Sequence, residues 1–477
     1  MRSRSHSTLP IPVAQPGTIP YHARGINARR TPSQGARSMA IDTATHAATL
    51  DQSTRRQQVV RVVVASAIGT TIEWYDFFLY GVAAALVFPQ KFFPASDPFI
   101  GTLLSFSTFF VGFVARPIGA AVFGHYGDRV GRKALLITTM MVMGLSTVGI
   151  GLVPGYDSIG VWGAVLLTLG RALQGIGVGG AWSGSVLMAG EWSDPKVRGF
   201  TTSFAQLGAP AGMILANGAL LLMTAVLDDA SFLSWGWRIP FLASIALVLL
   251  GLYIRTGVLE SPVFSSIKQG GKVARAPVMD VLRKNGREVL LTAFLRTGQH
   301  VPYYIFTTYI LSYGTQVLGF SRSTILNFVM VQSTFSLLTI PLFGHLSDRY
   351  GRRLITAIGC AGMVVVPFIA FAMLDTRVPW LVFLGILLPM PVHDMQYGPQ
   401  AAFIAESFPG SLRYSGSALG YQLASITAGG PAPIVATLLY SAFHGSGPIA
   451  IYIAISALIS LACVVALSHK AGALDAH

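Results

Sequence analysis

Charged side chains are scarce in this sequence: Asp, Glu, Lys and Arg make up only 11% of its 477 residues. Soluble proteins carry about 25% charged residues, so the composition excludes a water-exposed globular protein of this length. Cysteine is almost absent, since Cys360 and Cys463 are the only two, and both lie in apolar runs. A disulfide framework is therefore excluded, and we interpret both as small core residues. The sequence also lacks clusters with metal-ligand spacing and nucleophile–base pairs, so we predict no metal, no cofactor and no enzymatic activity.

Long apolar runs take the place of the missing charge. Hydrophobic residues make up 52% of the chain, and the mean hydropathy is +0.60. Runs of roughly 20 apolar residues cross the hydrocarbon core of a lipid bilayer as helices. We therefore predict an all-α membrane protein with twelve transmembrane helices. The predicted spans are 62–88, 100–123, 135–153, 161–188, 199–226, 238–256, 288–316, 322–343, 354–374, 379–402, 414–440 and 448–468.

Two internal repeats divide these spans into related halves. GHYGDRVGRK at 124–133 returns as GHLSDRYGRR at 344–353, and the Glu-to-Arg spacing of 191–198 returns at 406–413. Glycines permit a tight chain reversal, an acid caps a helix start, and basic side chains stay in water at the membrane edge. Duplicated halves are common in membrane carriers. We predict two six-helix bundles related by a pseudo-two-fold axis.

The net charge of +14 reflects membrane orientation and not nucleic-acid binding, because the basic residues cluster in one tail and at the ends of apolar runs. The connections after even-numbered spans carry most of them, so we expect these loops and both termini in the cytoplasm. The basic tail has two alternative interpretations. It is an organelle transit peptide, or translation starts at Met39. The predicted organisation is a disordered tail (1–57), an N-terminal bundle (58–256), a cytoplasmic loop (257–287), a C-terminal bundle (288–469) and a short tail (470–477). We expect a monomer in the lipid bilayer.

Several charged residues fall inside the predicted spans. Each costs about 2.5 to 3.5 kcal/mol at the bilayer centre if it faces lipid, so they are expected to face a shared cavity. Arg116 is placed nearer the cytoplasmic end of the second span. The predicted proton-coupling residues are Glu73, Asp76, His300 and Asp394, because paired or buried titratable groups exchange protons near neutral pH. The alternatives are a structural ion pair of Glu73 or Asp76 with Arg171, and a hydrogen-bonded core role for His300.

Donor-rich stripes on the fourth and seventh spans predict the substrate site. A guanidinium holds a carboxylate through two parallel hydrogen bonds, so Arg296 is the main candidate for an anionic substrate. The predicted substrate-binding residues are Arg171, Gln174, Arg296, Tyr303 and Tyr304. The glycines at 175, 177, 179 and 180 sit within a membrane helix and follow no strand, so we interpret them as helix-packing residues and not as a dinucleotide loop. Prolines around 389–399 indicate either backbone exposed to a cavity or a gating kink.

The repeated motif resembles the cytoplasmic signature of the major facilitator superfamily. IEWYDFFLYG (72–81), ARPIGAAVFGHYGDRVGRK (115–133), RALQGIGVGG (171–180), SWGWRIPF (234–241) and ESPVF (260–264) are similar to the metabolite:proton symporter family. Within it, HDMQYGPQ (393–400) and LRYSGSALGYQLAS (412–425) look most like the shikimate-type branch. The resemblance implies a proton symporter of a small organic acid, shikimate-like or a dicarboxylate, in a bacterial inner membrane. Alternatives are uptake of a zwitterion such as proline or betaine, and a sensor on a carrier fold.

One departure from the family concerns the fourth span, where relatives commonly read GGEW and this chain has Ala181 in place of the acid. The resemblance therefore leaves the coupling role to Glu73 and Asp76. The predicted cytoplasmic gate consists of ion pairs among the repeated motifs, although the same charges would also serve orientation alone. Its residues are Asp128, Arg129, Arg132, Glu191, Arg198, Asp348, Arg349, Arg352, Glu406 and Arg413.

Overall fold

The structure is a computed structural model that describes residues 52–94, 98–130, 132–256, 277–409 and 412–467. All secondary structure in these ranges is helical, which confirms the all-α prediction. Residues 1–51 of the predicted tail (1–57), residues 257–276 of the predicted loop (257–287) and residues 468–477 lie outside the described ranges. Residues 52–57 of the predicted tail are helical and open α2. Residues 277–287 of that predicted loop are helical and open the second half of the chain.

The first half contributes six main helical segments. Apolar residues recur all around these helices, as expected for segments that contact both lipid and protein. They are α2 (Gln52–Leu86), α4 (Pro98–Val130), α5 (Arg132–Leu152), α7 (Val161–Trp192), α8 (Arg198–Gln206) continued by α9 (Gly208–Val226), and α11 (Arg238–Thr256). Short helical turns connect them, namely α3 (Phe88–Phe92), α6 (Tyr156–Ile159), η1 (Pro195–Val197), α10 (Asp229–Ser231) and η2 (Phe232–Gly236).

The second half repeats this plan with more breaks. Its seventh span is made of α13 (Pro277–Leu295), α14 (Thr297–Tyr304), η3 (Ile305–Tyr309), α15 (Ile310–Ser312) and η4 (Tyr313–Val317). The other spans are α16 (Arg322–Tyr350), α17 (Arg352–Asp375), α18 (Pro379–Leu387) with α19 (Pro389–Glu406), α20 (Arg413–Ala424) with η6 (Ser425–Gly429) and α21 (Pro431–Phe443), and α22 (Gly447–Ala466). Proline at 389 and 431 removes a helical hydrogen bond at two of these joints.

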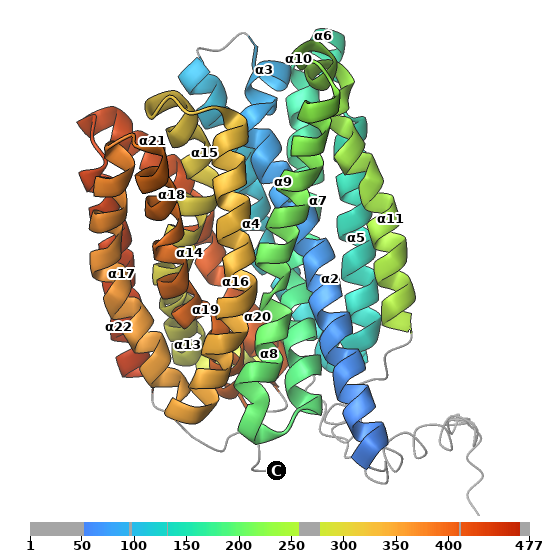
Figure 1. Ribbon diagram of the computed structural model, residues 1–477. Coiled ribbons are helices and arrows are strands. Elements are labelled where there is room, and N and C mark those ends of the chain that lie inside the picture. The colour runs from blue at the N-terminus through green and yellow to red at the C-terminus, as the bar shows by residue number, and fades with distance from the viewer. Residues whose placement is uncertain (1–51, 95–97, 131, 257–276, 410–411, 468–477) are drawn as a thin grey trace, which may run out of the picture. The chain divides into compact units, whose positions relative to one another are not determined.

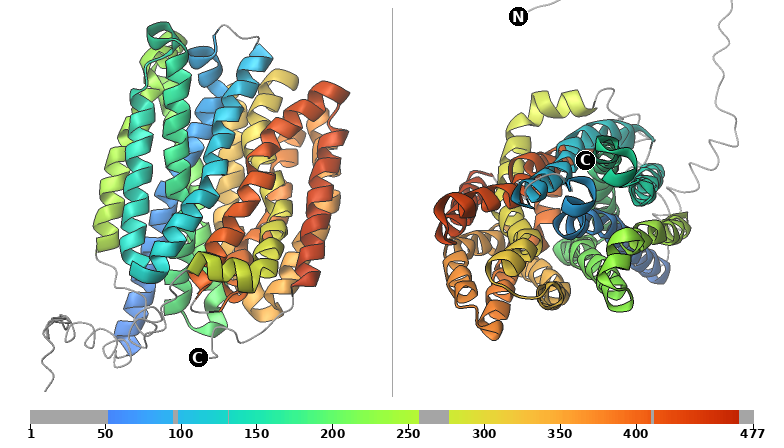
Figure 2. Two further views of the ribbon diagram at one scale, coloured as in Figure 1. Left: turned by 180° about the vertical axis from the view of Figure 1, so that it is seen from behind. Right: turned by 90° about the horizontal axis from the view of Figure 1, so that it is seen from above.

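The described residues contain nine helices that are long and apolar enough to cross a membrane, and a bent pair around Trp237 adds a tenth. The remaining two spans, 277–317 and 379–406, carry the polar residues of the seventh and tenth predicted helices. Seen from above, the blue-to-green first half and the yellow-to-red second half lie side by side (Figure 2, right). The described chain begins with α2 and ends with α22 at the same end of the bundle (Figure 1).

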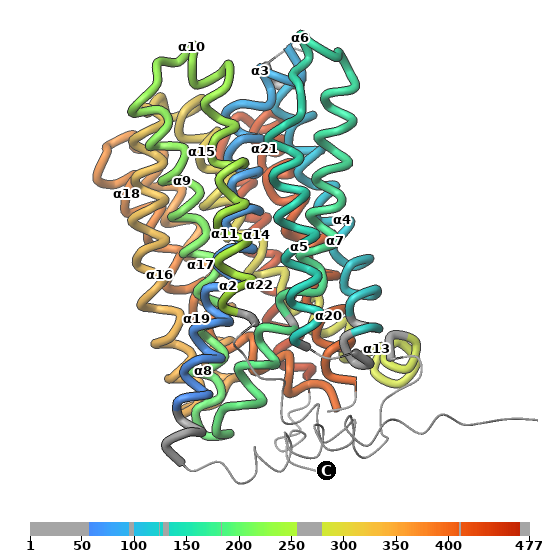
Figure 3. The backbone as a smooth tube through the Cα atoms, turned by 90° about the vertical axis from the view of Figure 1, so that its right-hand side faces the viewer, coloured from blue at the N-terminus to red at the C-terminus, as the bar shows by residue number. Residues whose placement is uncertain are grey.

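This end also carries Lys196, Arg198, Arg349, Arg352 and Arg413, and we name it the basic end. The helix α13 lies there and changes direction at Asn285, where the backbone leaves helical geometry (Figure 3). It packs on α20 and α22 of its own half and also on α4 of the first half.

Close packing of α4 against α7 brings two arginines into the centre. A side-chain carbon on Gly175 would lie 2.2 Å from the carbonyl oxygen of Gly112, and one on Gly179 would lie 2.1 Å from that of Arg116. Only glycine allows two helix backbones to approach this closely. The interpretation of these glycines as packing residues is confirmed, and the contact places Arg116 beside the helix that carries Arg171.

Candidate functional site

The charged residues predicted within the membrane are buried in protein. Exposed fractions are 5% for Glu73, 1% for Asp76, and 0% for Arg171, Arg296 and Asp394. Arg116 is also fully buried. They come from α2, α4 and α7 in the first half, and from α19 and the joint between α13 and α14 in the second, so both halves contribute to one central region. The expectation that these charges avoid lipid is confirmed.

Phe77 contacts two guanidinium groups of the first half. The Cζ atom of Arg116 is 4.0 Å from the centre of the Phe77 ring, and that of Arg171 is 4.1 Å from it. Cations at this distance are attracted by the ring face. An aromatic ring cannot replace the hydrogen bonds that water gives a guanidinium, so donors remain available for an anion.

Arg171 is partly satisfied within its own half. It donates to Oε1 of Gln174, and Nε2 of Gln174 donates to Thr147 Oγ1 at 2.8 Å and to the Asp76 carbonyl at 3.2 Å. The predicted shared face of Arg171 and Gln174 is therefore present. Nε and Nη2 of Arg171 have no hydrogen-bond partner among the described residues. Both carboxylate oxygens of Asp76 are likewise without one in the described chain.

Arg116 has more unpaired guanidinium nitrogens than Arg171 among the described residues. None of its three guanidinium nitrogens has a hydrogen-bond partner in the described part of the chain. The Tyr304 hydroxyl of the second half is near, yet without the geometry of a hydrogen bond. The Tyr304 ring packs on Phe113, 5.1 Å between centres, and Arg116 lies 4.6 Å from the same Phe113 ring. Arg116 therefore faces the contact between the halves.

Each guanidinium nitrogen of Arg296 has a partner in its own half. Its Nε donates to Gln400 Oε1 at 3.1 Å, Nη1 donates to the Tyr421 carbonyl, and Nη2 contacts Nε2 of His300. The guanidinium also lies over the Tyr421 ring. The residue predicted as the main anion clamp thus has an acceptor at every nitrogen, whereas Arg116 and Arg171 do not.

The contact with Arg296 also determines the state of His300. A guanidinium only donates, so Nε2 of His300 must accept and the ring must be neutral with its proton on Nδ1. That Nδ1 has no partner among the described atoms and lies beside Gly429, where an added side-chain carbon would meet it at 3.0 Å. Protonating His300 would place two cations in contact, which makes it a poor proton carrier in this arrangement.

Further buried polar groups surround this region without partners in the described chain. They are the hydroxyls of Tyr303, Tyr304, Tyr397 and Tyr421, Nε2 of Gln400 and Oε1 of Gln299. Buried polar groups are normally hydrogen-bonded, and a cluster of exceptions from both halves marks a place where a polar ligand or water completes the bonding. A separate pair, His393 and Asp394, lies within the second half and is hydrogen-bonded at 2.8 Å.

At the basic end, the halves are joined by a carboxylate at a helix start. Asp348 of α16 accepts the backbone N–H groups of Gly199 and Phe200, each at 2.8 Å, in the first turn of α8. Helix starts have unpaired N–H groups and a partial positive charge, so an anion is stabilised there. Arg352 extends the contact, because its Nη2 is 3.4 Å from Asp348 and 2.9 Å from Glu406.

Other predicted gate residues have different positions. Arg413 donates to the carbonyls of Ala405 and Phe408, and Arg198 donates to that of Gly190. The charges of both arginines also act on Glu406, so Arg198 interacts with the opposite half. Glu406 lies beyond the predicted tenth span, and burial raises the pKa of its carboxyl while Arg352 opposes this. Glu191 is half-buried near the end of α7.

Arg349 is exposed, and its guanidinium lies 5.5 Å from the centre of the Tyr350 ring. The side chains of Asp128, Arg129 and Arg132 lie outside the described residues.

More contacts between the halves run from the basic end toward the centre. The Tyr414 hydroxyl donates to the Gly180 carbonyl at 2.6 Å, and the Trp182 ring stacks on Tyr421 with centres 3.4 Å apart. Trp182 also donates to Gln206, which itself donates to the Tyr397 carbonyl at 3.1 Å. The basic end is therefore closed in this conformation.

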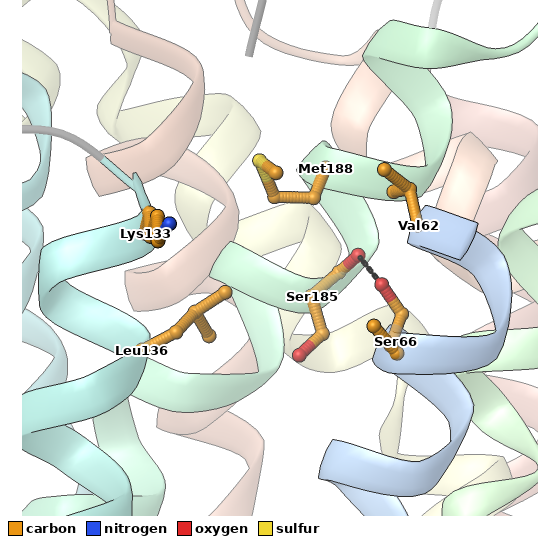
Figure 4. A pocket seen from close by; sticks show the side chains of 7 residues that line it. Val62, Ser66, Lys133, Leu136, Ser185 and Met188 are labelled. Atoms are coloured by element: carbon orange, nitrogen blue, oxygen red, sulfur yellow. Dashed lines mark hydrogen bonds between the residues drawn. The ribbon is translucent and has the colours of Figure 1, made fainter. Parts of the chain in front are cut away.

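A small pocket lies between α2, α5 and α7, apart from the central arginines (Figure 4). Ser66 on its wall donates to the Ser185 carbonyl at 3.2 Å, and most other lining groups are apolar. Ser66 precedes Asp76 by ten residues, which is about 15 Å along a helix. The pocket offers no anion-binding group to the central site.

Sequence reasoning underestimated Arg116. The predicted second span, 100–123, is confirmed as the apolar part of α4, and Arg116 lies toward its basic end as expected. Local sequence does not show that its guanidinium approaches Tyr304 of the second half. Phe77, Tyr421 and His393 were also left out of the predicted site. Their polar or aromatic character within a span was visible, but the contacts that give them a role are made between distant segments.

The sequence matches the Major Facilitator Superfamily over residues 66–432. The chain belongs to this superfamily. It is 41% identical to the inner membrane metabolite transport protein YhjE of Escherichia coli K12, over 86% of this chain and 94% of that one. It is 40% identical to the E. coli shikimate transporter (89% and 97% covered) and 32% identical to the E. coli proline/betaine transporter (86% and 84% covered).

The fold is similar to that of the E. coli proton:xylose symporter XylE, with a TM-score of 0.69, 19% identity, and 85% and 95% of the two chains covered. This confirms the predicted major facilitator fold of two six-helix bundles. The resemblance to transporters of this superfamily is likewise confirmed. The chain is a multi-pass membrane transporter rather than an enzyme.

Proposed function

We propose that this transporter moves a small organic acid together with protons, by alternating access to a site between its two halves. The observation that carries the proposal is the pair of buried guanidinium groups of Arg116 and Arg171. All three nitrogens of Arg116, and Nε and Nη2 of Arg171, lack hydrogen-bond partners in the described chain. Such groups bind a carboxylate strongly because the anion replaces hydrogen bonds that burial has removed. Shikimate-like acids and dicarboxylates are the favoured substrates, in keeping with the relative named as a shikimate transporter.

In the proposed binding mode, the unpaired donors of Arg116 and Arg171, both next to Phe77, bind the acid. Gln174 orients Arg171, and the free hydroxyls of Tyr303 and Tyr304 reach the polar groups of the substrate from the second half. Arg296 shapes that second half through its contacts with Gln400 and Tyr421. Binding to groups from both halves would draw them together, which is the coupling that alternating access requires.

For proton coupling, Glu73 and Asp76 lie one helical turn apart on α2, close to the proposed anion site. Asp76 is buried and its carboxylate oxygens lack partners among the described residues, so a proton there would relieve an uncompensated charge. We propose that protonation of this pair accompanies loading of the acid. Asp394 and His300 were predicted for the same role. Of these, His300 is the weaker candidate because of its contact with Arg296.

The proposed membrane is a bacterial inner membrane, as for the relative YhjE, with the basic end in the cytoplasm. Closure of that end by Asp348, Arg352 and Glu406 then describes a state whose cytoplasmic gate is shut. Opening the gate requires α8 to leave Asp348, and the site would then face the cytoplasm.

An uptake screen in reconstituted vesicles tests the proposal. Labelled shikimate, dicarboxylates, aromatic acids and betaine are offered with and without an acid-outside pH gradient. We expect at least one acid to accumulate only with the gradient. Gradient-independent uptake of every acid, or accumulation of none, would contradict proton-coupled transport of an organic acid.

A second test asks whether the carboxylates of α2 couple transport to protons rather than bind the acid. Replacing Glu73→Gln together with Asp76→Asn should abolish accumulation driven by the gradient more completely than it reduces counterflow exchange, because exchange needs no net proton movement. Unchanged accumulation would remove this pair from coupling. An Asp157→Asn variant, which alters an exposed acid in α6, is the matched control.

Uptake of a zwitterion is the alternative, favoured by the relative named as a proline/betaine transporter. A quaternary ammonium group binds well to aromatic rings but is repelled by neighbouring guanidiniums. Competition of unlabelled betaine or proline against labelled acid uptake decides between the two substrates. Strong competition by betaine would favour the zwitterion.

A further inference from the structure

A hydrogen-bonded chain of side chains lies inside the second half, behind the proposed anion site. Asp394 is fully buried, and its Oδ1 is 2.8 Å from Nδ1 of His393. The hydroxyl of Thr339 on α16 donates to the other carboxylate oxygen. Nε2 of His393 is 2.7 Å from Nε2 of Gln299, which lies on α14. The chain therefore links three helices of the second half.

The contacts fit one assignment of the protons. When Asp394 is ionised, it accepts from the Thr339 hydroxyl and from Nδ1 of His393. Nε2 of His393 then carries a lone pair that accepts from the Gln299 amide. The imidazole is neutral in this arrangement, with one nitrogen ready to take a further proton.

Gln299 can serve both protonation states of His393. Its Oε1 is buried and has no partner in the described chain, while its Nε2 faces the imidazole. Protonation of His393 would turn Nε2 from acceptor to donor, and a half-turn of the Gln299 amide would then present Oε1 to it. The unpaired oxygen would gain a hydrogen bond in that state.

The groups around His393 suit a positive charge that is balanced by Asp394 and lies close to the contact between the two halves. Tyr303 stacks on His393 with ring centres 4.9 Å apart, and it faces Phe78 of the first half at 5.9 Å. The other titratable or charged groups near the pair are Tyr397 on α19, His300 and Arg296 on α14, and Cys360 on α17, which contacts Gln396. The group that α16 brings to the pair is the neutral Thr339. Asp394 is therefore the carboxylate that balances an imidazolium at His393.

We propose that His393, held between Asp394 and Gln299, binds a cotransported proton. The proton adds to the Nε2 lone pair, the ring becomes an imidazolium, and the Asp394 carboxylate balances the charge without itself being protonated. The inference rests on the proposed proton-coupled function and locates a proton site in the second half, in addition to the acids of α2. Tyr303 connects the site to the interface between the halves, so its loading would be sensitive to their separation.

The test uses full-length protein in proteoliposomes, with the acid that the wild type accumulates best. His393→Gln should still equilibrate the acid but lose accumulation above equilibrium. Gln299→Glu stabilises the imidazolium and should move the pH profile of uptake to higher pH by about one unit, whereas Gln299→Leu should move it to lower pH. Gln332→Leu is the control, because Gln332 is also a buried glutamine without partners in the described chain but lies elsewhere on α16.

The outcomes are distinguishable. Opposite shifts for the two Gln299 variants, with none for the control, support a protonating His393, because a packing defect would not change sign with the charge of the substituent. If the wild type accumulates an acid but His393→Gln accumulates it equally, or the Gln299 variants leave the profile unmoved, the proposal is overturned while the proposed function stands. If the wild type shows no gradient-driven accumulation of any acid, both are overturned.

Discussion

Asp348 and Gly199 join the two halves of the chain, with the carboxylate oxygen of one 2.8 Å from the backbone nitrogen of the other. The second carboxylate oxygen is equally close to the next backbone nitrogen, that of Phe200. A single side chain of α16 thus caps a helix of the opposite half. Because the capped N–H groups have no partner within α8, separating the halves exposes both the helix start and the carboxylate.

The carboxylate charge of Asp348 is expected to stabilise the closed basic end. Asp348→Asn removes a charge-assisted contact of about 1.5 to 3 kcal/mol, which shifts the equilibrium toward the open gate roughly ten- to a hundredfold. Alkylation of a cysteine introduced at buried Ser203 should accelerate accordingly, with little background because Cys360 and Cys463 are buried. Asp229→Asn, at an exposed position near the other end, is the control. Equal alkylation rates in both variants would argue against a role of Asp348 in closing the basic end.

Close approach of α8 to α16 depends on Gly199. A side-chain carbon there would lie 2.7 Å from Oδ1 of Asp348 and 2.8 Å from the carbonyl oxygen of Gly344, and the backbone oxygen cannot move aside. We therefore expect Gly199→Ala to prevent full closure of the basic end. Uptake should fall although the amount of protein in the membrane is normal. The matched control is Gly218→Ala, where the nearest atom is Cε of Met330 at 3.8 Å. Similar uptake by the two variants would contradict this account.

Arg116 is expected to be unfavourable for stability and necessary for binding. Removing an uncompensated buried cation relieves a desolvation cost, so Arg116→Met should leave the melting temperature of the empty protein unchanged or raise it by about a few degrees. The rise in melting temperature that a transported acid gives the wild type should disappear. The measurement is thermal unfolding in detergent with and without the acid. A preserved ligand-induced rise would show that Arg116 does not hold the anion.

Arg296 should behave in the opposite way. Arg296→Gln leaves buried acceptors at Gln400 and the Tyr421 carbonyl unpaired, which is expected to lower stability by about 2 kcal/mol or more. The melting temperature should fall even without substrate, unlike that of Arg116→Met. Arg322→Gln at the exposed start of α16 serves as the control. If Arg296→Gln instead melts like the wild type and only loses the response to acid, Arg296 is a binding residue after all.

Much of the fold followed from local patterns. The apolar runs predicted the spans, and the repeated motif predicted two halves, because both depend on residues near each other in sequence. The seventh span was less well predicted, since residues 277–287 were expected in a loop and form the start of α13 instead. Their mixed composition gives no long apolar run, and the helix is stabilised by packing on α20 and α22. Tertiary contacts of this kind override local preference.

The sequence by itself determined that charged residues in the spans must be sheltered from lipid, because the cost of exposing them there is independent of any particular neighbour. Only the tertiary structure decided which arginine is free. Arg116 and Arg296 are the same side chain and are both fully buried, and they differ because α19 and α20 bring acceptors to Arg296, whereas aromatic rings surround Arg116. Whether a buried donor is satisfied depends on groups from distant segments, and their positions are set when the helices pack.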